Sequence, residues 1–384
     1  MCCSGRLRCG ASARAWRSGT RSSAGGRRRQ RAQTFRRRER TFTPCIVFPL
    51  DRLWDYSQRG VFQPQDSRVR PGNEEKLMQL GLIGLGKMGG NMAERLRKAG
   101  HKVVGFDFSA EAVKRLNDAG SVGVSSLEDL VKNLTDSPRA IWIMVPAGDP
   151  VDQTIAKLKP LMKKGDIFID GGNSNYKDSQ RRHDELKKEG FEFVDVGTSG
   201  GVWGITEGYS MMIGGDDAPV KYLTPIFEAL APAEKEGWGH VGPSGAGHFV
   251  KMIHNGIEYG IMQAYAEGFS IMKAKTPMHL DLVQISEIWR YGSVVRSWLL
   301  DLTADALKKN PTLEGLEAYV PDSGEGRWTV FEAIDLNVSA PVITDALIRR
   351  LRSREENNFT DRMLAVMRNE FGGHAVKMAP AGEK

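Results

Sequence analysis

The chain has 384 residues, of which 40% are hydrophobic and 26% charged; it is long enough for two folded domains, and it has no run of about 18 apolar residues that would predict a transmembrane helix. Its formal net charge of +7 is unevenly spread, because residues 1–77 hold 18 Lys and Arg against 6 Asp and Glu, whereas residues 78–384 hold 36 against 41. The mildly acidic balance of residues 78–384 argues against a nucleic-acid-binding domain.

Residues 1–77 combine many Arg, Ser and Gly residues with few large apolar ones. Such a segment cannot bury enough apolar surface to order itself, so we expect a disordered, Arg-rich extension that is dispensable for folding and activity. Three interpretations stay open: an organelle transit peptide, a basic tail that contacts nucleic acid, or translated upstream sequence that the native protein lacks. The last is favoured because Met78 stands directly before the first strand pattern.

All four cysteines, Cys2, Cys3, Cys9 and Cys45, lie in this extension. Residues 78–384 therefore offer no disulfide, no thiolate metal site and no cysteine nucleophile. The seven histidines show no ligand spacing either, so we expect no metal. Cysteine usage fits a reducing compartment, and we expect a cytoplasmic protein, with organelle targeting by residues 1–77 as the alternative.

A βαβ pattern begins the body of the chain. Residues 79–84 are predicted to form a buried strand, a helical pattern follows and stops at Gly100, and residues 102–107 form a second strand pattern. Between the first strand and the helix lies a G-x-G-x-x-G motif made of Gly84, Leu85, Gly86, Lys87, Met88 and Gly89. These glycines let the backbone approach a pyrophosphate at a helix N-terminus, so the pattern predicts a dinucleotide site.

The end of the second strand indicates which dinucleotide is bound. Asp107 would accept hydrogen bonds from the ribose hydroxyls, and its charge would repel a 2′-phosphate. Phe108 follows it and offers no cation to meet such a phosphate. We therefore expect NAD as the cofactor, with NADP less favoured.

Three further apolar runs, at residues 140–145, 166–170 and 191–196, alternate with helical patterns. This alternation predicts a doubly wound, mostly parallel α/β sheet over residues 78–244. Ligands of such sheets bind beyond the carboxyl ends of the strands. Three loops of small residues follow strands at that edge: Val145-Pro146-Ala147-Gly148, Gly171-Gly172-Asn173-Ser174-Asn175-Tyr176 and Thr198-Ser199-Gly200-Gly201.

Residues 245–384 are mostly helical in pattern and begin with one long helix over about residues 245–273. On that helix Lys251, His254, Asn255 and Glu258 stand at offsets of 0, 3, 4 and 7, which share one narrow face. The amine and the carboxylate could act as a paired base and acid, although solvated helix faces often carry the same charge spacing.

The other positions of this part carry simpler expectations. Met252, Ile253 and Ile257 should point away from the polar face and pack. Residues 324–328, Gly-Glu-Gly-Arg-Trp, are the clearest loop between the later helical patterns.

From Met78 to about His374 the chain resembles decarboxylating 6-phosphogluconate dehydrogenase, most specifically at residues 171–176, 199–201 and 247–259. The body is shorter than the commonest members and is similar to the short bacterial, NAD-preferring type. The resemblance implies a Rossmann domain over residues 78–244, an all-helical dimerisation domain over residues 245–384, and a homodimer or higher homo-oligomer with shared active sites.

The same resemblance implies oxidative decarboxylation of 6-phosphogluconate, with Lys251 as general base and Glu258 as general acid. The implied substrate-binding residues are Asn173, Ser199, Gly200, Gly201, His254, Asn255, Tyr259, Arg350, Arg368 and His374. Arg368 and His374 would reach the substrate from a partner subunit. The implied cofactor-binding residues are those of the Gly84–Gly89 motif, Asp107, Val145, Pro146, Ala147 and Asn173.

Two departures and two alternatives accompany the resemblance. Ser323 stands where longer members carry a phosphate-binding Lys, so Arg327 would have to compensate, and Arg349 rivals Arg350 if the helix register slips by one.

A 3-hydroxyisobutyrate-type dehydrogenase shares the opening motif and a helical Lys but gives Glu258 no role. A cofactor-binding structural protein would need neither Lys251 nor Glu258.

Overall fold

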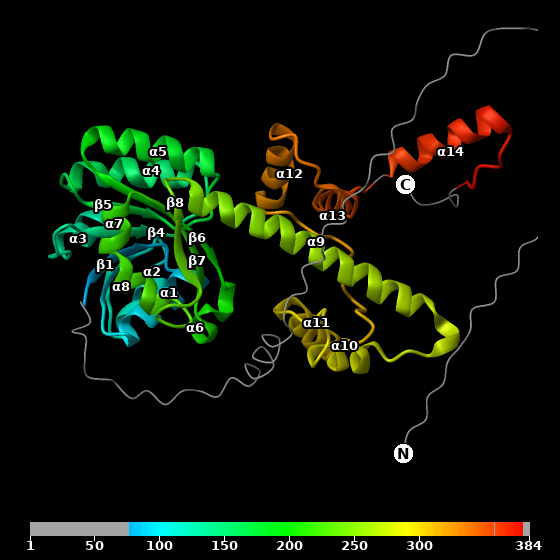
Figure 1. Ribbon diagram of the computed structural model, residues 1–384, viewed down its shortest axis with the longest axis horizontal. Coiled ribbons are helices and arrows are strands. Elements are labelled where there is room, and N and C mark those ends of the chain that lie inside the picture. The colour runs from blue at the N-terminus through cyan, green and yellow to red at the C-terminus, as the bar shows by residue number, and fades with distance from the viewer. Residues whose placement is uncertain (1–76, 357, 379–384) are drawn as a thin grey trace, which may run out of the picture. The chain divides into compact units, whose positions relative to one another are not determined.

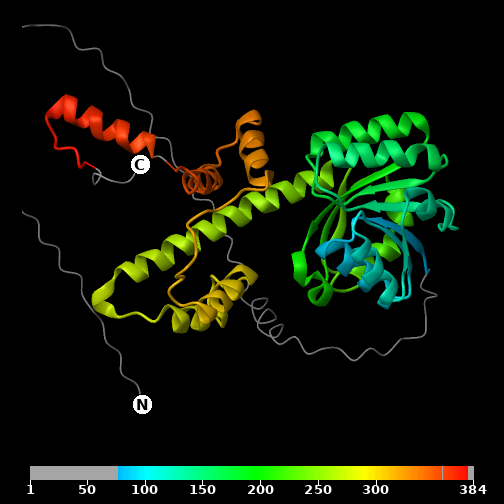
Figure 2. The same ribbon diagram turned by 180° about the vertical axis from the view of Figure 1, so that it is seen from behind.

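The computed structural model of the chain describes residues 77–356 and 358–378. Figures 1 and 2 show these residues from two opposite sides. The predictions for the extension, apart from Leu77, lie outside the described residues. Within the described part of the chain, no helix combines the length and the apolar character needed to span a membrane.

One eight-stranded sheet organises the first part of the described chain, with the strand order β3-β2-β1-β4-β5-β6-β7-β8. All neighbouring strands pair in parallel except β6 and β7, which are antiparallel. The predicted doubly wound, mostly parallel sheet is thus confirmed. Its strands are β1 (Gln79–Ile83), β2 (Lys102–Phe106), β3 (Val122–Val124), β4 (Ala140–Ile143), β5 (Ile167–Asp170), β6 (Glu192–Ser199), β7 (Ser210–Gly215) and β8 (Trp238–Gly242).

Helices connect these strands and cover both faces of the sheet (Figure 1). They are α1 (Lys87–Lys98), α2 (Ala110–Asp118), α3 (Leu127–Lys132), α4 (Asp149–Leu158), α5 (Tyr176–Glu189), α6 (Gly204–Glu207), α7 (Asp217–Tyr222) and α8 (Thr224–Leu230), with short 3₁₀ turns at η2 (Lys159–Leu161) and η3 (Gly201–Trp203). Residues of α1, α2 and α8 pack in one core cluster, and residues of α3, α4 and α5 pack in another. Every residue of β4 and β5 is buried, as expected for central strands covered on both sides.

Local sequence explains where several of these helices begin and end. Ser109 and Ser126 accept hydrogen bonds from backbone N–H groups in the first turns of α2 and α3, and Asn175 does the same for α5. Helix α5 ends at Gly190, whose φ of 90° is the left-handed conformation that glycine adopts without strain. The Asn175 cap fixes the start of α5 immediately after the loop at residues 171–175.

A single long helix, α9 (Ala246–Ala274), leaves the sheet and joins it to the remaining helices (Figures 1 and 2). Its first turns contact β6, β7 and β8, and the helix also contacts α10 (Leu282–Arg290), α11 (Trp298–Lys309), α12 (Glu325–Asp335) and α13 (Pro341–Arg352). The remaining helical elements are η4 (Thr276–Met278) and α14 (Phe359–Gly372). The predicted helical second part is confirmed, whereas its division from the first part at residues 244–245 stays a prediction.

The helical part buries only small apolar clusters. One gathers Tyr259, Val330, Ala346 and Leu347, and another gathers Phe269, Leu300 and Leu307. Many large apolar side chains of this part are exposed instead, including Phe371 at 95% and Phe359 at 69%.

The expectation of a loop at residues 324–328 is wrong. Helix α12 begins at Glu325, and only its N-cap, Gly324, has a non-helical backbone with φ of 107°. The second glycine, Gly326, lies within the helix, where a Cβ would approach Cε2 of Tyr259 to 2.3 Å. Glycine thus allows close packing of α12 against Tyr259 and does not interrupt the helix.

Candidate active site

The first turn of α9 is held against the sheet by the carboxylate of Asp195. This fully buried side chain at the middle of β6 accepts hydrogen bonds from the backbone N–H groups of Gly245 (2.6 Å) and His248 (2.9 Å). A carboxylate at a helix N-terminus satisfies unpaired N–H groups and interacts favourably with the helix dipole. The sequence interpretation missed Asp195, whose only signal was an acid inside an apolar strand.

Glycines allow α9 to lie unusually close to β6 and β7. A Cβ on Gly247 would lie 2.5 Å from the carbonyl oxygen of Met212, and one on Gly197 would lie 2.3 Å from the Cβ of Lys251. Both separations are far shorter than van der Waals contact. The absent side chains therefore set the depth at which Lys251 enters the structure.

Lys251 is buried, at 5% exposed, and its ammonium group has specific partners. Nζ donates a hydrogen bond to Oδ1 of Asn255 (2.7 Å) and lies 3.2 Å from Nδ1 of His254. Burial lowers the pKa of Lys251 below its ordinary value, and the charges of Glu258 and Glu325 offset only part of that effect. A lowered pKa raises the share of neutral amine near pH 7, which a general base requires.

A cavity of about 990 Å³ collects the polar face of α9 and two of the predicted loops. Lys251, His254, Asn255 and Glu258 line it together with Asn173, Ser199, Gly200 and Gly201, and α11 contributes residues 297–299 and Leu302. Met88 of the G-x-G-x-x-G motif lines the same cavity, so the motif and the α9 face meet in one space.

The expectation that Ile253 and Ile257 pack away from the polar face is wrong. Both line the cavity, and Ile257 is 51% exposed. Met252 is buried, as expected. The cavity wall therefore combines polar residues, among them Lys251, with apolar residues of α9 and α11.

Asn173 joins two of the loops at the carboxyl edge of the sheet. Its side-chain oxygen accepts the N–H of Thr198 (2.9 Å), and its Nδ2 donates to the carbonyl of the same residue (3.2 Å). The backbone of Asn173 has φ of 53°, a left-handed conformation that Asn tolerates better than most residues. These bonds fix the strand end that leads into Ser199 and Gly200 of the cavity wall.

The G-x-G-x-x-G loop has the shape that a dinucleotide requires. Gly84 adopts φ of 94°, and a Cβ on Gly89 would lie 1.9 Å from the Gly84 carbonyl oxygen, so both positions need glycine. Gly86 caps α1 without any side-chain hydrogen bond and has open space where a Cβ would stand. The N–H groups of the first turn of α1 therefore face room for a pyrophosphate.

The carboxylate of Asp107 completes this candidate cofactor site. Its Oδ2 accepts the N–H of Leu85 (2.6 Å), and its Oδ1 accepts the N–H of Ser109 (2.8 Å). The side chain is thus held at the end of β2 beside the motif. Among the described residues, no group of three or more His, Cys, Asp or Glu side chains is arranged to hold a metal ion.

Tyr259 and Arg350 lie together but do not line the cavity. The Arg350 guanidinium carbon lies 3.4 Å from the centroid of the buried Tyr259 ring, and Ser323 N–H donates to the Tyr259 hydroxyl (3.4 Å). Nearby Arg327 is paired with Asp322 (3.0 Å), which also pairs with Arg354 (2.8 Å).

Arg368 and His374 are also absent from the cavity wall. Arg368 lies on α14, a helix with no buried residue, and His374 follows its end. Within one subunit, the structure thus brings together eight of the twelve predicted catalytic and substrate-binding residues in the cavity wall, while Tyr259 and Arg350 lie against each other outside it. These eight are Lys251, Glu258, Asn173, Ser199, Gly200, Gly201, His254 and Asn255.

Two family models match the described chain. The model described as the NAD binding domain of 6-phosphogluconate dehydrogenase matches residues 79–241. The model described as the 6-phosphogluconate dehydrogenase C-terminal domain matches residues 247–371. A relative from Haloferax volcanii, named as an NAD⁺-dependent, decarboxylating 6-phosphogluconate dehydrogenase, is 44% identical over 300 residues, which are 78% of this chain and 98% of the relative.

Solved structures show the same arrangement. A Plasmodium falciparum 6-phosphogluconate dehydrogenase, solved alone, with NADP⁺ and with 6-phosphogluconate, matches with a TM-score of 0.66 and 30% identity over 79% of this chain and 67% of that one. A 3-hydroxyisobutyrate dehydrogenase of Mycobacterium tuberculosis matches with a TM-score of 0.57 and 22% identity over 70% of this chain and 91% of that one. The second likeness concerns the fold alone.

Proposed function

The chain belongs to the 6-phosphogluconate dehydrogenase family, and we propose that it converts 6-phosphogluconate to ribulose 5-phosphate and carbon dioxide while reducing a nicotinamide cofactor. The observation that carries this proposal is the buried amine of Lys251, which shares one cavity with the carboxylate of Glu258. The cavity is open to the cofactor motif through Met88. A base, an acid and a hydride acceptor site thus converge.

Lys251 acts first, as general base. In its neutral form, which burial favours, Nζ takes the proton from the C3 hydroxyl of the substrate. A nicotinamide held at the G-x-G-x-x-G motif would supply the acceptor for the hydride that leaves C3. His254 and Asn255, both within hydrogen-bond distance of Nζ, hold the amine in a defined position and stay available to bind substrate hydroxyls.

Decarboxylation follows from the chemistry of the product. Oxidation at C3 places a ketone β to the C1 carboxylate, and such an acid loses carbon dioxide as its bonding electrons move into the carbonyl. The protonated Lys251 stabilises the developing oxyanion of the enediol. Glu258, on the same face of α9 and at the same cavity, then delivers a proton to C1 and gives the ketopentose phosphate.

We assign the cofactor as NAD in preference to NADP. The carboxylate of Asp107 is fixed beside the motif by Leu85 and Ser109 N–H groups, so it cannot turn away from a 2′-phosphate without losing both bonds. The family itself does not decide the choice, because the Haloferax relative is named NAD⁺-dependent and the Plasmodium enzyme was solved with NADP⁺. We propose further that no metal takes part, since Lys251 supplies the cationic stabilisation.

The substrate phosphate is proposed to bind to Arg350, which is held over the Tyr259 ring outside the cavity wall. Ser323 replaces the Lys of longer family members there, and the pairing of Arg327 with Asp322 leaves it only partly available. Arg368 and His374 are proposed to arrive from a second copy of the chain. The exposed apolar residues of α14, including Phe359 and Phe371, support an oligomer in which that helix is covered.

The alternative, a 3-hydroxyisobutyrate-type dehydrogenase, accounts for the fold and for Lys251 but not for Glu258 at the cavity. An oxidation without decarboxylation needs no acid at C1. The deciding experiment incubates purified protein with NAD and 6-phosphogluconate and records reduced cofactor and carbon dioxide together. Equal amounts of both support the proposal. NADH without carbon dioxide refutes the decarboxylation, and turnover of 3-hydroxyisobutyrate alone supports the alternative.

The remaining expectations are proposals of the same kind. We propose that residues 78–244 and 245–384 are the two domains and that the enzyme works in the cytoplasm. Denaturant unfolding followed by separate probes in the two segments tests the first, because two domains can unfold in two transitions. Cell fractionation of the source organism tests the second.

A further inference from the structure

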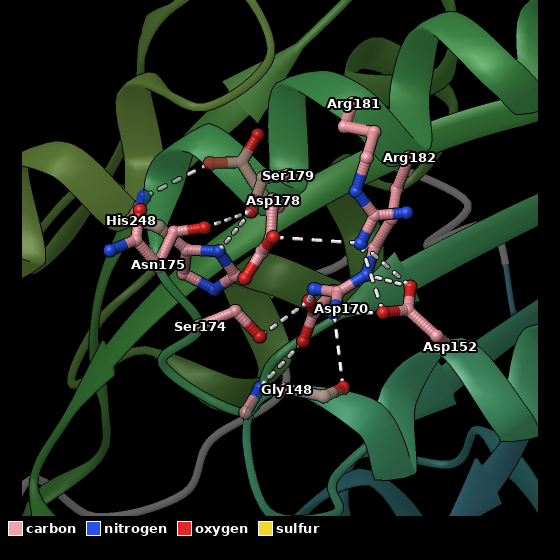
Figure 3. Close-up of polar contacts among 12 residues, drawn as sticks. Gly148, Asp152, Asp170, Ser174, Asn175, Asp178, Ser179, Arg181, Arg182 and His248 are labelled. Atoms are coloured by element: carbon pink, nitrogen blue, oxygen red, sulfur yellow. Dashed lines mark hydrogen bonds and ion pairs between the residues drawn. The ribbon is translucent and has the colours of Figure 1, made fainter.

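Arg182 is a buried charged residue that the proposed reaction does not use. It lies on α5, and its side chain is only 2% exposed. Its guanidinium donates hydrogen bonds to three partners: Asp152 (Nε to Oδ1, 2.7 Å; Nη2 to Oδ2, 3.2 Å), Asp170 (Nη1 to Oδ2, 3.1 Å) and the carbonyl oxygen of Gly148 (Nη2, 3.1 Å). Figure 3 shows Arg182 between these groups. Four of the five guanidinium donors are thus engaged.

The bond to Gly148 ties Arg182 to the loop that is proposed to contact the cofactor. Gly148 ends the segment Val145-Pro146-Ala147-Gly148 and caps α4 with φ of 90° and no side-chain hydrogen bond. Its carbonyl and the first-turn residue Asp152 are both held by Arg182. Arg182 therefore contacts both the start of α4 and the loop before it.

The bond to Asp170 ties Arg182 to the loop that carries Asn173. Asp170 is fully buried at the end of β5; its Oδ1 accepts the N–H of Gly172 (3.1 Å), and its Oδ2 accepts the hydroxyl of Ser174 (2.8 Å). These bonds hold the residues on both sides of Asn173, as Figure 3 shows for Ser174. The two loops also touch directly, since a Cβ on Gly172 would lie 2.6 Å from the Val145 carbonyl oxygen.

We propose that Arg182 is a positioning residue that holds the loop of residues 145–148 and the loop of residues 171–176 at a fixed separation. It does not line the cavity, and it acts through the Gly148 carbonyl on one side and through Asp170 on the other. Hydride transfer requires the donor and acceptor carbons to be aligned within a fraction of an ångström, and a displacement of about 1 Å costs about 100-fold in rate. This inference rests on the proposed function for its kinetic part.

The adjacent residue, Arg181, provides a matched control. It also pairs with Asp152 (2.9 Å), but it is 42% exposed and otherwise contacts only Asp178 and Glu185 on its own helix. Burial alone would raise the pKa of the Asp152 carboxyl, yet hydrogen bonds from Arg182 and Arg181 hold that pKa below its ordinary value. Both arginines therefore stabilise Asp152, whereas of the two only Arg182 reaches Gly148 and Asp170.

The first experiment measures amide hydrogen exchange in the cofactor-free, full-length protein. Arg182→Lys keeps the positive charge but cannot reach all three partners at once. We expect exchange in residues 145–149 and 171–176 to rise on the order of tenfold in Arg182→Lys, with β1 and β2 unchanged, and no such rise in Arg181→Lys. A uniform rise over the whole chain, or equal effects in both variants, would overturn the proposal.

The second experiment measures turnover with saturating NAD and 6-phosphogluconate, unlabelled or deuterated at C3. Misalignment slows hydride transfer, so Arg182→Lys should lose turnover on the order of tenfold and show a larger deuterium isotope effect than the wild type. A purely structural role would reduce the amount of active protein and leave the isotope effect unchanged. Arg181→Lys should match the wild type in both respects.

A third variant covers the case in which Arg182→Lys fails to fold. Ser174→Ala removes only the hydroxyl that Asp170 holds, and it should raise exchange in residues 171–176 and increase the isotope effect. Wild-type values for both in this variant would refute the proposal. If the wild type itself shows no turnover of 6-phosphogluconate, the proposed function fails. The role of Arg182 is then still decided by comparing hydrogen exchange and NADH binding between Arg182→Lys and Arg181→Lys.

Discussion

Gly197 lies directly against Lys251: a Cβ added to Gly197 would stand 2.3 Å from the Cβ of Lys251 and 2.6 Å from the Gly247 carbonyl oxygen. The first obstacle is the root of a side chain and the second is backbone, so neither can rotate away. β6 and α9 are therefore in close contact at Lys251, the proposed base.

Gly197→Ala should consequently impair both stability and activity. Relief of the clash requires α9 to move away from β6, and overpacking of this kind costs about 1–3 kcal/mol. Thermal unfolding and turnover at saturating substrate measure the two effects. Gly239→Ala on β8 is the control, because its Cβ would meet nothing within 4 Å and should leave both quantities near wild type. Wild-type turnover in Gly197→Ala would show that the depth of Lys251 does not matter.

Lys251→Met should abolish turnover while leaving cofactor binding nearly intact, because the amine lies on α9 and the dinucleotide motif lies at the start of α1. Methionine has a similar length and no charge to bury, so the fold should tolerate it. NADH fluorescence titration and a turnover assay on the same preparation separate the two properties. Residual turnover within tenfold of wild type would remove Lys251 from its role as base.

The pH dependence of kcat/KM should rise with pH as Lys251 loses its proton. Burial lowers its pKa, so the midpoint of this rise should lie below the ordinary lysine value of 10.5. The charge of Glu325 raises that pKa, and Glu325→Gln should therefore move the midpoint to lower pH. A midpoint that stays in place or moves upward would contradict the electrostatic account.

The same shift makes stability depend on pH. Because the pKa of Lys251 is lower in the folded chain than in the unfolded one, the unfolded state binds this proton more strongly. Wild-type stability should then rise with pH between the two pKa values, and Lys251→Met should lack that contribution. Denaturant unfolding at a series of pH values compares the two proteins, and parallel curves would argue against a lowered pKa.

The cofactor preference should favour NAD by at least about tenfold, or about 1.4 kcal/mol, because a 2′-phosphate would face the Asp107 carboxylate. Steady-state kinetics with both cofactors test this, and equal specificity constants would refute it. Asp107→Asn combined with Phe108→Arg should move preference toward NADP. Phe108→Arg alone is the control, since Phe108 is 90% exposed and the repulsion from Asp107 remains.

Mixed oligomers should reveal whether the tail completes a neighbouring site. Arg368→Ala and Lys251→Met subunits, each inactive alone, should regain activity after subunit exchange, because a hybrid dimer then contains one site with both residues intact. Absence of recovery despite proven exchange would mean that each site is built within one chain.

The sequence predicted β1, β2, β4, β5 and β6 because each contains a short, mostly apolar run between helical patterns. It missed β3, β7 and β8, whose glycines, including Gly123, Gly214 and Gly215, obscure the strand pattern. Gly214 is required because a Cβ there would lie 2.6 Å from the Asp195 carboxylate and 2.7 Å from the backbone nitrogen of Gly247, and the second contact exists only once α9 is docked. The strands at this end of the sheet thus depend on tertiary contacts that local pattern does not contain.

The candidate site likewise contains residues that local sequence pattern predicts and residues that depend on tertiary contacts. The face that carries Lys251 and Glu258 follows from helical spacing alone, whereas the placement of Asn173 beside Ser199 depends on pairing between β5 and β6. Neither Asp195 nor Arg182 could be assigned from the sequence, because their partners lie 50 and 12 or more residues away. Buried polar groups of this kind are identified only by the atoms that satisfy them.

The continuity of α9 has a last consequence. The proposed base and acid stand seven residues apart on one unbroken helix, which separates their Cα atoms by about 10.5 Å along its axis at about 1.5 Å per residue. Because the helix contacts both the sheet and the later helices, a tilt between these two parts moves Lys251 and Glu258 together. Such a motion can change the position of the cofactor relative to the two residues, but the helix rise keeps the separation of their Cα atoms constant.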